Sequence, residues 1–73
     1  MTPIKMHPCT SSQIAKFGYD PESSTMRIEF SRGGLYDYRA VPATVFQDFV
    51  AASSKGSFHY HNIRTKFAYD KLG

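Results

Sequence analysis

The sequence has little that could cross-link the chain or anchor it. Its 73 residues include a single cysteine, Cys9, so no disulfide can form within the chain. It has no tryptophan, and no apolar run approaches the length of a signal-peptide core or a membrane span. We therefore expect a soluble protein of the reducing cytoplasm with no membrane partner.

Patterns for catalysis and metal binding are also missing. His59 and His61 are two residues apart, so on a helix they point to nearly opposite sides, and only on a strand could they share a metal. No third ligand is close by, and neither a nucleophile–base pair nor a Walker loop can be built from the sequence. The sequence therefore favours a protein that is not an enzyme, with no metal, no cofactor and no small-molecule substrate.

Aromatic residues and positive charge are what the chain does contain. Six Phe and five Tyr are many for this length, and each large ring buries roughly 150–250 Å². Nine Lys and Arg against six Asp and Glu give a net charge of +3. This balance is compatible with a polyanionic partner, although the positive charges are scattered along the chain.

Residues 1–12 contain two prolines and no hydrophobic periodicity. They are predicted to form a flexible N-terminal arm before a single domain over 13–73. The first strand is expected at 13–19, with one face formed by Ala15, Phe17 and Tyr19. A four-residue turn at 20–23 follows, because Pro21 presets φ and the Asp20 carboxylate can accept a backbone N–H bond.

The second strand is expected at 24–30, where Met26, Ile28 and Phe30 alternate with polar residues. The turn at 20–23 would set Phe17 opposite Met26 and Ala15 opposite Ile28. The turn after this strand has two alternatives. A two-residue loop at Gly33-Gly34 would place the carboxylate of Asp37 on the core face, which disfavours it.

A three-residue loop at 31–33 avoids this cost, with Gly33 supplying the positive φ that the loop requires. It sets three cross-strand pairs: Ile28 with Tyr36, Met26 with Tyr38, and Arg27 with Asp37. Tyr36 and Tyr38 then face the core. Core packing is therefore favoured over base stacking, the role of exposed aromatics in nucleic-acid-binding sheets.

Two helices are predicted after this hairpin. Pro42 suits the first turn of a helix, and apolar residues then recur at helical spacing up to Ala52: Val45, Phe46, Phe49 and Val50. This helix should cover the face that bears Met26, Ile28, Tyr36 and Tyr38. Ser53-Ser54 interrupts it and can cap a second helix, which ends near residue 62 or 63 and packs through Phe58 and Ile63.

The predicted fold class is therefore α+β. A three-stranded antiparallel meander is packed by one helix and followed by a second short helix. Residues 64–73 return as an extended segment or a short strand. Within this fold Gly33, Tyr36, Tyr38 and Pro42 are assigned structural roles.

The start of the second helix is the best anion-binding candidate in the sequence. Ser54, Lys55 and Gly56 expose free N–H groups at the positive end of a helix dipole, although ordinary capping would use the same residues. Arg64 and Lys66 join this site if the tail folds back. Arg32 and Arg39 form a second basic cluster on the hairpin, while the outer face of the sheet carries charges of both signs.

Several short motifs together resemble the KTSC domain, which is named after the C-terminal region of certain lysyl-tRNA synthetases. The resemblance covers roughly residues 12–72. Its motifs are Ile14, Gly18-Tyr19-Asp20, Phe30, Gly33-Gly34, Tyr36-Asp37-Tyr38, Val41-Pro42, Ser54-Lys55-Gly56 and Asn62-Ile63-Arg64. The family occurs also as small bacterial and phage-type proteins, and its attachment to a tRNA synthetase has suggested RNA binding. It offers no active site to map.

From these observations we expect a non-catalytic accessory module that binds RNA, such as a tRNA-like molecule, or another polyanion through its backbone phosphates. Such binding would weaken steeply with salt. A protein–protein interaction module is the alternative, using the sheet edge or the tail Phe67-Ala68-Tyr69. A small enzyme is a third possibility.

Overall fold

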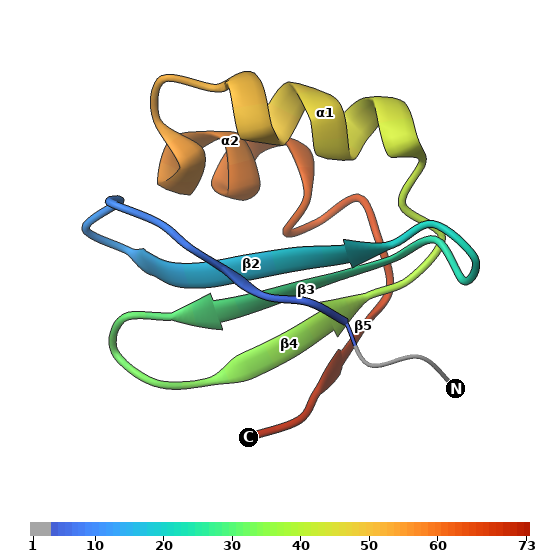
Figure 1. Ribbon diagram of the computed structural model, residues 1–73, viewed down its shortest axis with the longest axis horizontal. Helices are drawn as coiled ribbons and strands as arrows, with labels where there is room; N and C mark the ends of the chain where they lie inside the picture. Colours follow the sequence, from blue (N-terminus) through green and yellow to red (C-terminus); the bar gives the residue numbers. More distant parts are fainter. Residues whose placement is uncertain (1–3) are drawn as a thin grey trace.

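The computed structural model of the protein describes residues 4–73. Five antiparallel strands form one sheet in the order β1-β2-β3-β4-β5, and both helices lie over the same face of it (Figure 1). The strands are β1 His7–Pro8, β2 Ile14–Asp20, β3 Thr25–Phe30, β4 Leu35–Tyr38 and β5 Tyr69–Lys71. The helices are α1 Ala43–Ala51 and α2 Lys55–Asn62.

The α+β class agrees with the prediction, but the sheet is larger than the predicted meander. Strands β2 to β4 form the meander, and one short strand is added at each edge. β1 comes from the segment predicted as a flexible arm, where His7 pairs with Phe17; residues 1–3 of that arm lie outside the described part. β5 comes from the returning tail. Strands of two or three residues are too short to show a periodic pattern, so pairing with a longer neighbour determines them.

The β3–β4 hairpin has the predicted register. Ile28 pairs with Tyr36, Met26 with Tyr38, and Arg27 with Asp37. The N–H of Gly33 donates to the Phe30 carbonyl at 3.0 Å, and the φ of Gly33 is 98°. Arg27 binds the carboxylate of Asp37 through two hydrogen bonds of 2.7 and 3.0 Å. A local turn and a local charge pair therefore fix this hairpin.

The predicted β2–β3 register is wrong by two residues. Phe17 lies opposite Ile28 and Tyr19 opposite Met26, because the loop spans 21–24 and Ser24 adopts a left-handed φ of 54°. The Asp20 carboxylate does accept the predicted bond, from the Glu22 N–H at 3.1 Å. A shift by two keeps the same side chains facing the core, so alternation alone could not reveal the error.

The predicted core position of Ala15 is also wrong. The pairing shifts between Ile14 and Lys16, as at a β-bulge, and Ile14 is fully buried in place of Ala15. A bulge adds one residue to one strand, which reverses the facing of the residues beyond it. Nothing in the short run Gln13-Ile14-Ala15 signals where such a residue is inserted.

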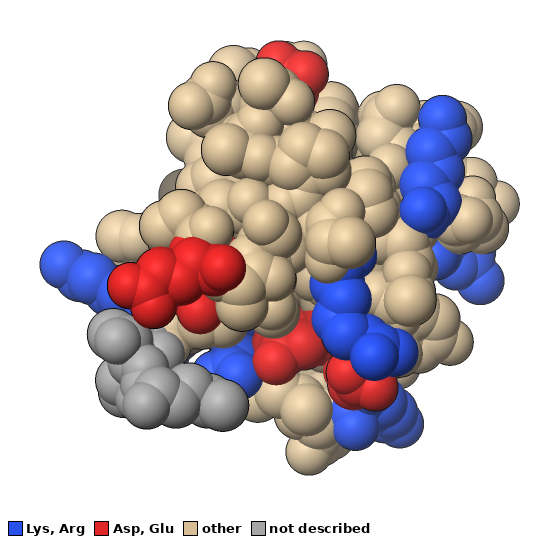
Figure 2. Space-filling model, turned by 90° about the vertical axis from the view of Figure 1, so that its right-hand side faces the viewer, with Lys and Arg blue, Asp and Glu red and all other residues tan. Residues whose placement is uncertain are grey.

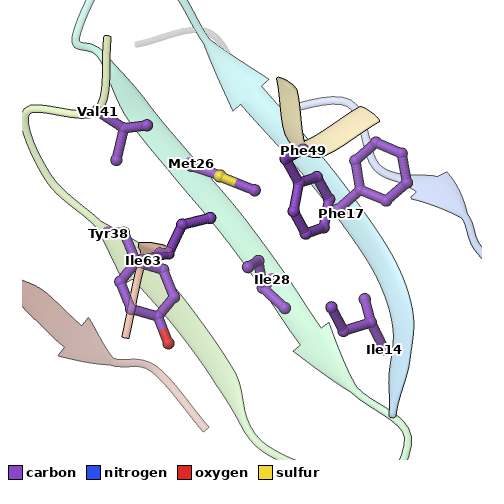
Figure 3. Close-up of a cluster of buried hydrophobic side chains, with 8 residues drawn as sticks. All are labelled: Ile14, Phe17, Met26, Ile28, Tyr38, Val41, Phe49 and Ile63. Carbon is purple, nitrogen blue, oxygen red and sulfur yellow. The ribbon is translucent and has the colours of Figure 1, made fainter. Parts of the chain in front are cut away.

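One hydrophobic core joins the sheet to the helices (Figure 3). Its buried members are Ile14, Phe17, Met26, Ile28, Tyr38, Val41, Phe49 and Ile63. Helix α1 packs mainly on β2, where the rings of Phe49 and Phe17 meet edge to face at 5.2 Å and those of Phe46 and Tyr19 stack at 4.8 Å. Val50, predicted in the same apolar stripe, is 44% exposed. No helix within residues 4–73 is long and apolar enough to cross a membrane.

Candidate nucleic-acid interface

A groove of about 1120 Å³ lies between α2 and the β3–β4–β5 side of the sheet. Its buried and half-buried lining includes Phe30, Tyr36, Tyr38, Gly56 and His59. Its exposed lining includes Arg32, Tyr60, Arg64 and Tyr69, together with the neutral polar residues Ser12, Gln13 and Thr65. The groove thus combines aromatic rings with two arginines, and none of the described residues that line it is acidic.

A hydrogen-bonded pair forms the deepest part of this groove. The hydroxyl of Tyr38 and Nε2 of His59 are 2.7 Å apart, and the two residues are only 3% and 8% exposed. Burial raises the pKa of Tyr38 to about 12. Burial, together with the positive charge of Arg64, lowers the pKa of His59 to about 4. Both side chains are therefore neutral at neutral pH, far from the pKa near 7 that suits a proton-transfer group.

The sequence reasoning missed the role of His59. It considered the histidine as a metal ligand and as an acid–base group, and not as the partner that a buried tyrosine hydroxyl needs. His59 lies four residues before Ile63, so both fall on the core-facing side of α2. That spacing is the signal that could have identified it. Among residues 4–73 no group of three His, Cys, Asp or Glu side chains could hold a metal ion.

Three tyrosine rings, including that of Tyr38, are neighbours along this side of the groove. Tyr69 on β5 lies directly opposite Tyr38 on β4, so both side chains are on the same face of the sheet. The ring of Tyr69 is 5.8 Å from that of Tyr38 and 5.6 Å from that of Tyr36. Tyr69 is still 53% exposed. The predicted inward position therefore holds for Tyr38, Tyr36 is half-buried, and Tyr69 is the tyrosine that solvent reaches.

The two arginines of the groove have no acidic partner among the described residues. Arg32 lies in the β3–β4 turn, and Arg64 follows α2. The Arg64 guanidinium carbon is 5.2 Å from the centroid of the Tyr60 ring, within cation–π range. The structure thus places Arg32 and Arg64 along one groove, although the sequence assigned them to two separate clusters.

The predicted anion site at the start of α2 adjoins the groove. Ser54 caps the helix, because its Oγ accepts the N–H of Ser57 at 3.3 Å. The ammonium group of Lys55 donates to the Ala52 carbonyl at 3.4 Å. Gly56 is buried, and a methyl group there would overlap the side chain of Gln13. A second hollow of about 320 Å³ beside this helix start shares Gly56, Gln13 and Tyr60 with the groove.

The other two predicted basic residues lie outside the groove. Lys66 is exposed and lines neither hollow. Arg39 forms an ion pair with Asp70 at 3.2 Å, and the alternation along β4 places it on the outer face with Arg27 and Asp37. Arg32 and Arg39 are therefore at opposite ends of the strand and do not form one cluster. Figure 2 shows acidic side chains close to basic ones on one side of the molecule, so that this side is not uniformly basic.

Comparison with known proteins gives a consistent result. The family model of the KTSC domain matches residues 10–67. A KTSC domain protein from Yersinia pestis, known from its crystal structure, has 38% sequence identity to this chain. The two structures match with a TM-score of 0.93, and the match covers 97% of this chain and 100% of that chain. Among curated relatives, a protein of Tsukamurella paurometabola is 39% identical over 85% of this chain and 92% of its own length.

A larger enzyme contains a similar region. A lysine–tRNA ligase of Nostoc sp. is 36% identical over 84% of this chain. The matched region is 11% of the ligase, so the chain spans only a small part of that relative.

Proposed function

The chain belongs to the KTSC domain family, and from this we propose that it is a small non-catalytic accessory module that binds RNA or another polyanion through backbone phosphates. The observation that carries the proposal is the groove. Two arginines without acidic partners line it, and no carboxylate among residues 4–73 faces them there. The net charge of +3 would add a weaker, general attraction.

Unpaired arginines suit this role for a physical reason. An arginine that already holds a carboxylate must give up that bond before it binds a phosphate, as Arg39 would have to release Asp70. Arg32 and Arg64 have no such cost within the described structure. Each presents a planar guanidinium with several N–H donors, which matches a phosphate better than an ammonium group does.

The relatives suggest which polyanion to test first. A lysine–tRNA ligase carries a similar region, so a tRNA-like RNA is the natural first ligand for this chain. The start of α2, at Ser54, Lys55 and Gly56, would provide further phosphate contacts beside the groove. Lys66 would attract phosphates only from outside it. A cytoplasmic location, expected from the single cysteine, stays a prediction.

We would test this by fluorescence anisotropy with labelled tRNA at low and at high salt. The double variant Arg32→Gln/Arg64→Gln should weaken binding about tenfold or more at low salt. The slope of log K against log salt concentration should also decrease by the equivalent of about two phosphate contacts. The matched control is Arg39→Gln/Lys66→Gln, which removes the same number of positive charges outside the groove. It should change the affinity by less than about threefold.

Each result has a clear reading. Absence of binding by the unmodified protein at low salt would refute the proposal. Equal losses in the two double variants would mean that net charge, and not the groove, determines binding.

A protein–protein interaction module is the second candidate. Three exposed large side chains favour it: Tyr60, Tyr69 and Leu72, at 57%, 53% and 48% exposure. Phe67 from the predicted aromatic tail contributes less, because it is half-buried against the core. Binding to a protein through these side chains would be largely insensitive to salt, whereas phosphate binding would not.

A further inference from the structure

We propose that the groove takes single-stranded RNA, with an unpaired base stacked on the exposed face of Tyr69. This inference rests on the proposed function and names the class of polyanion. Phosphate contacts alone do not distinguish a single strand from a duplex or from a sulfated polysaccharide. An accessible aromatic face does distinguish a single strand from a duplex, because an unpaired base can stack on it, whereas the bases of a duplex are stacked on each other.

Tyr69 has the geometry that a stacking platform needs. One side of the residue is supported by Tyr36 and Tyr38, whose ring centroids are 5.6 and 5.8 Å from its own. Just over half of the residue, 53%, is exposed to solvent, and this exposed part is where a base would stack. Backbone pairing of β5 with β4 holds it in register opposite Tyr38. A ring supported in this way loses little conformational freedom when a base binds.

The rest of the groove suits a strand that continues past one base. Tyr60 is a second exposed aromatic residue at 57%, and the Arg64 guanidinium lies over its ring. Arg64 and Arg32 line the same groove as Tyr69 and would bind phosphates of the strand.

The neutral lining favours bases over a fully charged polymer. Ser12, Gln13 and Thr65 provide hydroxyl and amide groups at the groove, and these can hydrogen-bond to base edges. In a duplex the Watson–Crick edges are paired and the ring faces are stacked on each other, so phosphates and 2′-hydroxyls would make most of the contacts. The groove should therefore prefer a single strand to a duplex of equal length.

The test compares three polyanions at the same low salt: a short oligouridylate, its duplex with oligoadenylate, and heparin, which has no bases. Competition against the labelled oligouridylate gives the three affinities. Two variants separate stacking from packing, since Tyr69→Leu keeps an apolar side chain against Tyr36 and Tyr38, while Tyr69→Phe keeps the ring. Circular dichroism and amide NMR spectra confirm that both variants are folded.

We expect the single strand to bind at least about fivefold more tightly than the duplex, which is the lower limit for one stacked base. Tyr69→Leu should weaken oligouridylate binding by at least about fivefold, with less than about a twofold effect on heparin. Tyr69→Phe should stay within about twofold of the unmodified protein for all three ligands.

The two hypotheses fail in different ways. If the unmodified protein binds none of the three polyanions, both are refuted. If it binds all three, this inference is overturned by either of two results. One is a duplex affinity equal to that of the single strand, and the other is a Tyr69→Leu variant whose oligouridylate affinity falls by less than about fivefold. Phosphate binding stands in both cases.

Discussion

The two tyrosines of the Tyr36-Asp37-Tyr38 motif have different surroundings, although they share one face of the sheet. Tyr38 is buried and its hydroxyl is bonded to His59, which completes the core at the base of the groove. Tyr36 is half-buried and supports the ring of Tyr69. The motif is therefore mainly structural. The exposed tyrosine of this cluster is Tyr69, which lies far from the motif along the chain.

The buried histidine should make folding stability depend on pH. The pKa of His59 falls from 6.5 to about 4 in the folded protein, so below pH 6.5 the unfolded chain binds a proton that the folded chain does not. Neutral His59 therefore makes its full contribution to the free energy of unfolding above pH 6.5, and this contribution is lost progressively as the pH falls toward 4. We expect a loss of about 2–3 kcal/mol in the free energy of unfolding, measured with urea across this range.

The variant His59→Gln keeps a hydrogen-bonding group beside Tyr38 but cannot titrate. Over the same pH range, the free energy of unfolding of this variant should fall less than that of the unmodified protein, and the difference should be about 2–3 kcal/mol. The matched control is His61→Gln on the same helix, because His61 is exposed. If His59→Gln and His61→Gln retain the same pH dependence as the unmodified protein, His59 is not the titrating group.

At the scale of single elements, local information was sufficient for the β3–β4 hairpin and for the extent of α1 along the chain, but not for its place over the sheet, since it packs mainly on β2. Turn residues, alternation and an opposite-charge pair lie within a few residues of each other there. It was harder to predict which residues of the apolar stripe on α1 are buried and which are exposed. Phe49 is fully buried, while Val50, the next residue, is 44% exposed. Helical spacing gives the direction of a stripe but not how far the neighbouring sheet extends beneath it.

Because Phe49 is buried and Val50 is exposed, substitutions at these two adjacent positions should lower the free energy of unfolding by very different amounts. Phe49→Ala removes a ring that packs on Phe17 and Phe58, and should lower the free energy of unfolding by about 3–5 kcal/mol. Val50→Ala should cost less than about 1 kcal/mol, because little apolar area is buried there. Thermal and denaturant unfolding of both variants measure the difference. Similar losses in the two would contradict the packing of α1 described above.

At the scale of the whole molecule, the two short edge strands complete the structure. β1 and β5 bring the two ends of the chain to opposite edges of the sheet. β5 covers the open edge of β4 and supplies Tyr69 to the groove. Long exposed edges invite pairing with another chain, and a three-residue strand leaves little edge for that.

Removal of residues 69–73 should therefore have two consequences. The loss of three cross-strand pairs should lower the free energy of unfolding by about 1–3 kcal/mol. The uncovered edge of β4 should also promote association, seen by light scattering as a concentration-dependent increase in mass. The full-length variant Leu72→Ser, at an exposed position, should remain as stable as the unmodified protein. A monomeric truncated protein of unchanged stability would show that β5 does not protect the sheet.

The sequence by itself determined the features that depend on near neighbours. These are the α+β class, the β3–β4 register through Gly33, the inward position of Tyr38 and the capping of α2 by Ser54. Each follows from turn chemistry, alternation or helical spacing within about ten residues. The resemblance to the KTSC domain was also present in the sequence, because it depends on motif order.

Only the tertiary structure decided the edge strands, the bulge near Ala15 and the composition of the groove. Arg32 and Arg64 are far apart in the sequence, as are Tyr38, His59 and Tyr69, and no local rule relates them. They line one groove because β5 pairs with β4 and α2 lies over the same face of the sheet. The residues of the candidate interface are therefore a result of packing, which one-dimensional patterns do not encode.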